Sequence, residues 1–182
     1  ASNNTAVGYF ALKANTTGSD NNAFGRQTLD ACTIGSNNSA FGSYALGALT
    51  EGAFNTALGV GALQTATTPN NNTAVGHTAL SSCTTGSENT ALGRIALFST
   101  TTGNNSVGIG YSALQAMTTG ANNIGIGNYA GDAITTASNN LAIGRNALTE
   151  NTSGTENVAI GNYSLDANTT ADANTAVGYE SL

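Results

Sequence analysis

Apolar and polar side chains recur at a fixed interval of 17 residues along the whole chain. Each unit has one glycine directly preceded by a large apolar residue, and these glycines are Gly8, Gly25, Gly42, Gly59, Gly76, Gly93, Gly110, Gly127, Gly144, Gly161 and Gly178. Asparagine stands four residues before the glycine in every unit except one, which has Ser106. Leucine stands four residues after it except at Gly131, and threonine stands eight residues after it from Thr16 to Thr169.

A constant period without insertions predicts that equivalent positions stack into columns along an axis, which is the arrangement of a solenoid. Seventeen residues are too few for the helix pair of helical arrays, whose repeats take about 33 residues or more. We therefore predict an all-β fold, a parallel β-solenoid or β-roll with one coil per repeat and eleven coils. At a strand spacing of roughly 4.8 Å the rod would be about 50 Å long.

Each coil is expected to contain a strand that ends at the glycine. Residues 140–144 alternate in size, which places Leu141 and Ile143 on one face of the strand. The glycine would form one corner of the coil, because it adopts backbone angles that other residues avoid. Thr-Thr-Gly and the following asparagine would form the second corner.

The segment between the two corners permits two predictions. In residues 111–117, Leu114 and Ala116 fit a second strand, whereas Ala113, Leu114 and Met117 fit a short helical turn. We expect the second strand and keep the helical turn as the alternative.

The chain is predicted to be a single repeat array over residues 1–182. Its columns of alanine, beginning with Ala6 and Ala23, would allow close backbone approach either across a thin coil or between neighbouring chains. Both ends fall inside a repeat, without a polar capping segment. Because open strand edges promote further pairing, we expect an excised piece of a longer array or an end-to-end polymer.

Composition and charge exclude several classes of function. Four Lys and Arg residues and a formal net charge of −6 do not suit nucleic-acid binding or anionic membrane surfaces. No stretch approaches the roughly 20 apolar residues of a spanning helix, so we expect no membrane insertion. Forty per cent apolar and 8% charged residues are the reverse of a disordered profile.

The sequence contains few residues that could serve as catalytic groups. Its single histidine, His77, shares a column with Tyr9, Arg26, Arg94 and Arg145, and such a varied column indicates a solvent-facing position. A general base needs a placed partner and a cleft. We therefore expect no enzymatic activity, no catalytic residues, no cofactor and no metal site.

Cys32 and Cys83 occupy the same column three coils apart, which would separate them by roughly 14 Å. A disulfide needs Cα atoms within about 7 Å, so the two cysteines cannot pair within one straight rod. Leu49, Met117 and Ile134 share this column, which favours a semi-buried apolar role over the alternative of a bridge between chains.

Two further motifs are set aside. Residues 108–113 and 125–130 satisfy G-x-G-x-x-[G/A], but the second glycine belongs to the repeat and no βαβ unit surrounds it. Calcium-binding β-rolls carry an aspartate in each turn, whereas only Asp20, Glu88 and Glu156 are acidic in the corresponding column.

Two polar columns remain. The asparagine column is predicted to hydrogen-bond turn backbone and its own stacked neighbours. The threonine column that begins with Thr16 and Thr33 raises the alternative of an ice-binding surface. The column of Tyr9, Tyr111 and Tyr179 raises the alternative of glycan binding, although the six tyrosines are dispersed along the sequence.

The repeat also resembles known proteins. Residues 4–18, N-T-A-V-G-Y-F-A-L-K-A-N-T-T-G, resemble repeats of bacterial and phage surface and tail-fibre proteins, often found upstream of an endosialidase-type intramolecular chaperone. Residues 105–110 and 156–161 are similar to head repeats of YadA-like trimeric autotransporter adhesins, although those repeats are shorter. The resemblance implies a left-handed trimeric β-roll, with Ile109 and Ile160 in the coil core and Gly110 and Gly161 at its corner.

These observations lead to one functional expectation. The chain would be a structural segment of an extracellular fibre on a cell or virion surface, the shaft or head of an adhesin, tail fibre or surface filament. It would associate with itself as a homotrimer or filament and serve attachment, with a surface receptor as a possible partner. The alternatives are a filament subunit that polymerises end to end and an ice- or glycan-binding solenoid.

Overall fold

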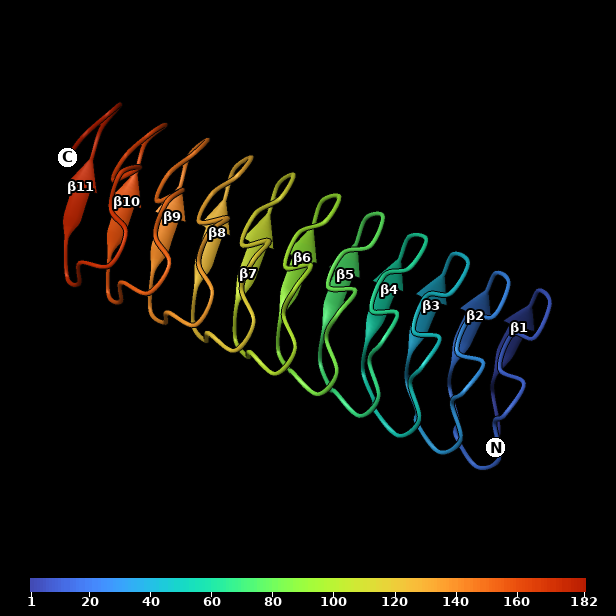
Figure 1. The fold of residues 1–182 in the computed structure, drawn as a ribbon. Helices are drawn as coiled ribbons and strands as arrows, with labels where there is room; N and C mark the ends of the chain where they lie inside the picture. The colour runs from blue at the N-terminus through green and yellow to red at the C-terminus, as the bar shows by residue number, and fades with distance from the viewer.

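The computed structural model describes all residues 1–182 as a rod of stacked coils, with one short strand per coil (Figure 1). The strands are β1 (Thr5–Val7), β2 (Asn22–Phe24), β3 (Ser39–Phe41), β4 (Thr56–Leu58), β5 (Thr73–Val75), β6 (Thr90–Leu92), β7 (Val107–Ile109), β8 (Ile124–Ile126), β9 (Leu141–Ile143), β10 (Val158–Ile160) and β11 (Thr175–Val177). They form one 11-stranded sheet in sequence order. The chain has no helix, and hence none that could cross a membrane.

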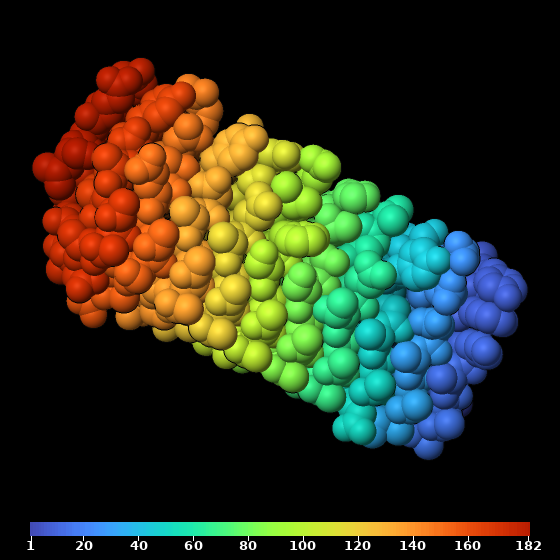
Figure 2. Space-filling view, in the orientation of Figure 1, coloured from blue at the N-terminus to red at the C-terminus, as the bar shows by residue number.

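The strands pair in parallel with a shift of one repeat. Ala6 pairs with Ala23, and every later strand follows in the same register. Of 118 backbone hydrogen bonds, 98 lie outside regular strand pairing, so bonds between coils also connect the turns. The predicted parallel β-solenoid with 17 residues per coil is confirmed. Figure 2 shows the coils closely stacked along the rod.

The predicted second strand is wrong, and the alternative helical turn is absent too. The residues after each corner glycine form a run of turns. The cause is a left-handed backbone at the second and fourth positions after the glycine, where Ser112 has a φ of 57° and Leu114 a φ of 52°. Strands and right-handed helices both require negative φ, so this alternation permits neither.

The core is a narrow space between two walls of each coil. One wall carries the central residue of the strand, such as Ala91 or Gly108, and the other carries the repeat leucine, such as Leu97. A β-carbon built on Gly108 would lie only 3.0 Å from Leu97 Cγ. The alanine columns therefore face the interior of a thin coil. Of the two expected positions, across one coil or between neighbouring chains, the structure has the first.

The strand faces are opposite to those implied by the resemblance. Ile109 and Ile160 are half-buried on the outside of the sheet. Ala159, the central residue of β10 next to Ile160, is completely buried. The narrow core accepts only alanine or glycine opposite a leucine, so the large residue turns outward. Gly110 and Gly161 do form the corner, with φ values of 131° and 132°.

Candidate functional site

The asparagine column forms a buried hydrogen-bond ladder inside one corner of the rod. Asn38 Oδ1 accepts a hydrogen bond of 3.0 Å from the backbone N–H of Asn55 in the next coil. Asn38 Nδ2 donates to the carbonyl of Gly52 at 2.9 Å. The predicted structural role of this column is confirmed, since both ends of the amide hold the turn backbone.

The threonine column forms a second ladder. The hydroxyl of Thr50 donates to the carbonyl of Thr67 at 3.1 Å, and Thr84 donates to Thr101 at 3.1 Å. The same bond recurs along the column from Thr16 to Thr152. The hydroxyl protons are therefore used within the protein rather than directed at solvent.

The two cysteines are free thiols buried in the core. Cys83 Sγ donates to the carbonyl of Gly86 at 3.2 Å. Burial raises the pKa of both thiols, and that of Cys83 reaches about 11, against an ordinary value of 9.0. Neither side chain has any exposed surface, so neither reaches a neighbouring chain in the folded protein.

A buried thiol with a raised pKa is expected to be unreactive and to make stability depend on alkaline pH. The unfolded Cys83 ionises near pH 9.0 and the folded one near about 11, so the folded state keeps an extra proton between these values. Its stabilising contribution is present below pH 9.0 and is lost as the pH rises to about 11. Urea midpoints of the wild type and Cys83→Ala across this window isolate the effect.

Thiol titration gives a second measurement of the same property. At pH 8 a disulfide reagent should label neither cysteine of the folded chain and should label both in denaturant. Rapid labelling without denaturant would show that the cysteine column opens to solvent in the native rod.

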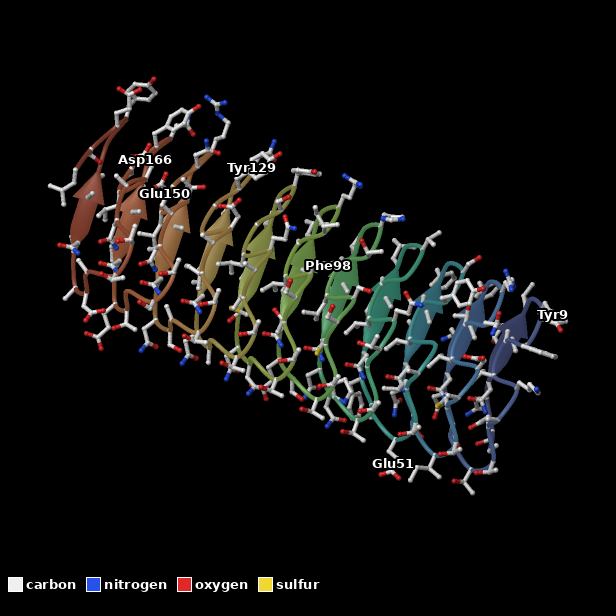
Figure 3. The ribbon with its side chains drawn as sticks, viewed as in Figure 1. Tyr9, Glu51, Phe98, Tyr129, Glu150 and Asp166 are labelled. Carbon is white, nitrogen blue, oxygen red and sulfur yellow. The ribbon has the colours of Figure 1, made fainter.

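The histidine, arginine and tyrosine side chains all lie along one edge of the rod. This edge consists of the two columns directly after the corner glycines, and we call it the Gly edge. These columns contain His77, every arginine and every tyrosine of the chain, namely Arg26, Arg94, Arg145, Tyr9, Tyr44, Tyr111, Tyr129, Tyr163 and Tyr179. Tyr9 and Tyr129 lie along this edge in Figure 3, and Glu51 lies on the opposite one. His77 is exposed, with Thr78 Oγ1 3.3 Å from its Nδ1.

Stacking brings these dispersed residues into contact. The guanidinium of Arg145 lies 4.7 Å from the ring centre of Tyr163, and Arg94 lies 5.5 Å from Tyr111. Tyr111 in turn meets Tyr129 edge to face at 5.3 Å between ring centres. Four of the six tyrosines therefore meet in pairs, Tyr111 with Tyr129 and Tyr163 with Tyr179, which their separation in sequence concealed. Sorting the residues by repeat column would have found these pairs.

One hollow opens on the Gly edge, between the coils of β8 and β9. Its cavity of about 430 Å³ is lined by Asn128, Tyr129, Asp132, Arg145, Asn146 and Thr149. Asp132 accepts a hydrogen bond from the Thr149 hydroxyl at 2.7 Å. Partial burial raises the pKa of the Asp132 carboxyl. Sequence reasoning missed this group, although the break in the leucine column at Gly131 marks the same unit.

The outward side of the sheet forms a second distinctive surface. We call it the outer sheet face, defined by the first and third residue of each strand from β1 to β11. The third residue is always large and apolar, and Leu58, Leu92 and Val177 are 50%, 46% and 67% exposed. From β7 to β10 the first residue is aliphatic as well. None of these positions carries a charge.

No group of three or more His, Cys, Asp or Glu side chains is placed to hold a metal ion. No protein family, curated protein or solved structure that we compared matches the chain.

Proposed function

We propose that the chain is a structural segment of an extracellular fibre, in which stacked coils provide reach for attachment to a surface. Its support is the uninterrupted register of the eleven strands, because a rod built this way lengthens by one strand spacing with each added repeat. The resemblance to adhesin and tail-fibre repeats points to the same role. We propose no catalytic activity.

Lateral self-association is part of this proposal, and the outer sheet face is the observation that carries it. Eleven strands of three residues cover roughly 50 by 10 Å, a flat area of roughly 500 Å². A row of large apolar third residues runs the length of this area, and aliphatic first residues widen the row from β7 to β10. The chain has a net charge of −6, yet this face has no charge. A second copy presenting the same face would cover it, and the resemblance implies a trimer.

The test is the mass of the intact chain in solution, measured by light scattering during size exclusion. We expect a multiple of 18.0 kDa, with a trimer as the form proposed. Ile143→Asp places a charge on the outer sheet face and should shift the protein to monomer. Thr119→Asp adds the same charge at an exposed corner and should leave the mass unchanged.

Two results would contradict this proposal. A wild-type chain that stays monomeric at all concentrations would remove the self-association. A broad, concentration-dependent polymer that Ile143→Asp leaves intact would favour end-to-end filaments instead. Circular dichroism of both variants checks that they remain folded.

A further inference from the structure

We propose that the hollow between the coils of β8 and β9 is a binding site for a sugar ring of a neutral glycan. The hollow is built from the same columns of two successive coils, since Asn128 stacks on Arg145, Tyr129 on Asn146 and Asp132 on Thr149. The cavity of about 430 Å³ falls within the range of roughly 300 to 1,000 Å³ seen for small-molecule sites.

Shorter side chains distinguish these two coils from the two coils before them. The column five residues after the corner glycine holds Phe98 and Gln115 in the preceding coils, and it changes to the shorter Asp132 and Thr149 here. The core below remains filled, because the side chain of Leu114 occupies the space that a residue larger than Gly131 would need. A β-carbon on Gly131 would lie 2.9 Å from Leu114 Cδ2. The hollow is therefore a surface feature and not a packing defect.

The lining matches a ligand rich in hydroxyl groups. Five of the six lining side chains are polar, and they offer both donors and acceptors. Asp132 accepts one bond from Thr149 and keeps further lone pairs, while Asn146 presents an amide that both donates and accepts. A sugar hydroxyl also donates and accepts, so it satisfies such groups. An apolar ligand would leave them unpaired at a cost in affinity.

One aromatic ring completes the site. Tyr129 is 40% exposed, and its contact with Tyr111 at 5.3 Å between ring centres holds it at the rim. An aromatic ring provides apolar contact area at a low cost in conformational entropy, which suits the C–H side of a sugar ring. Polar groups around a single ring therefore favour a pyranose over a linear polyol.

The charges favour a neutral sugar. Asp132 and Arg145 contribute one charge of each sign, so the lining has no net charge. An anionic sugar would gain from Arg145 but would meet Asp132 and a chain of net charge −6. Arg145 is already engaged, because its guanidinium lies over Tyr163 at 4.7 Å and its backbone N–H donates to Asn162 Oδ1 at 2.8 Å. A preorganised site of this kind loses little entropy when a ligand binds.

The test uses the full chain with neutral hexoses and N-acetylhexosamines as probes and glucuronic acid as the anionic comparator. Calorimetry gives affinity and stoichiometry, and amide chemical-shift changes locate the bound sugar. We expect at least one neutral sugar to bind once per chain and to shift the amides of residues 128–132 and 145–149. Thr149→Gln, which restores a long side chain, and Asp132→Asn should each weaken binding by about tenfold or more.

Tyr44→Ala is the matched control, because Tyr44 lies in the column of Tyr129 but away from the hollow. It should bind the sugar like the wild type, and equal thermal midpoints would show that all variants are folded. The proposal is overturned if no neutral sugar binds, if Thr149→Gln binds as well as the wild type, or if glucuronic acid binds more tightly. None of these readouts depends on oligomeric state, so the fibre proposal is tested separately.

Discussion

Replacing Gly93 with alanine is expected to lower the free energy of unfolding by more than about 4 kcal/mol. Single substitutions cause losses of this size only where they produce backbone strain, overpacking or a similarly specific defect. Gly93 has a φ of 140°, which side-chain-bearing residues rarely adopt. A β-carbon there would also lie 2.4 Å from the carbonyl oxygen of Gly110 in the next coil. Because that atom is backbone, it moves only if the two coils separate. Urea unfolding followed by circular dichroism measures the loss.

Gly178→Ala is the matched control for this prediction. Gly178 has nearly the same φ, 135°, but the nearest atom to its β-carbon would be Ser181 Cβ at 3.7 Å. In this variant the free energy of unfolding should therefore fall only by the cost of backbone strain, about 1 to 3 kcal/mol. If both variants lost the same free energy, contact between coils would not be what requires glycine in this column.

The second large effect is expected for Asn72→Ala, at about 2 to 6 kcal/mol. Asn72 Nδ2 donates to the carbonyl of Gly86 at 2.8 Å, and its Oδ1 accepts from the backbone N–H of Asn89 at 2.9 Å. Alanine would leave both backbone groups buried without partners, and each such group costs about 1 to 3 kcal/mol. The free energy of unfolding from urea titration gives the value.

Asn72→Ser distinguishes lost hydrogen bonds from lost volume. The chain already contains a serine in this column, and Ser106 Oγ still accepts the N–H of Asn123 at 3.2 Å. Serine at position 72 should therefore keep one of the two bonds. Its loss in free energy of unfolding should be about half of that caused by alanine. An Asn72→Ser variant as unstable as Asn72→Ala would argue against the ladder as the source of the effect.

The solenoid was predictable because stacking acts on every unit in the same way. Close backbone contact at Gly93 and Gly110 and the buried amide ladder both demand one residue type per coil, and that demand produces the 17-residue period. The strand positions follow from the alternation in size before the glycine. These features are local and recur, so a single sequence displays them eleven times.

Which strand face lies inside was not predictable from alternation alone. In a globular core the larger residue usually turns inward. Here the opposite wall brings Leu97 within 3.0 Å of a β-carbon at position 108, so the space between the walls admits no second large side chain. The distance between the walls is a property of the closed coil, and no residue pattern encodes it directly.

The turns were mispredicted for a related reason. Leu80 and Leu97 have φ values of 52° and 51°, a region that costs a non-glycine residue roughly 1 to 2 kcal/mol. The conformational preference of leucine therefore argues against a positive φ at these positions. Complete burial of these leucines and bonds between coils, such as Leu97 N–H to the Ala113 carbonyl at 2.9 Å, offset the strain.

The candidate site was only partly visible in the sequence. The Gly edge can be found by sorting residues into columns, since all six tyrosines fall into two of them. The hollow cannot be found this way, because its volume depends on side-chain lengths in two neighbouring coils. Only the break at Gly131 marked the unit.

The direction of the hydrogen bonds also determines how the rod would respond to force. Most backbone bonds join one coil to the next and so lie along the long axis. Tension applied to the two ends would load the coils in series and peel them from an end, one after another. Each peeled coil of 17 residues would release roughly 55 to 60 Å of extended chain. Added coils would thus increase length without increasing tensile strength. In the proposed fibre, load would have to pass between chains by shear across the outer sheet face.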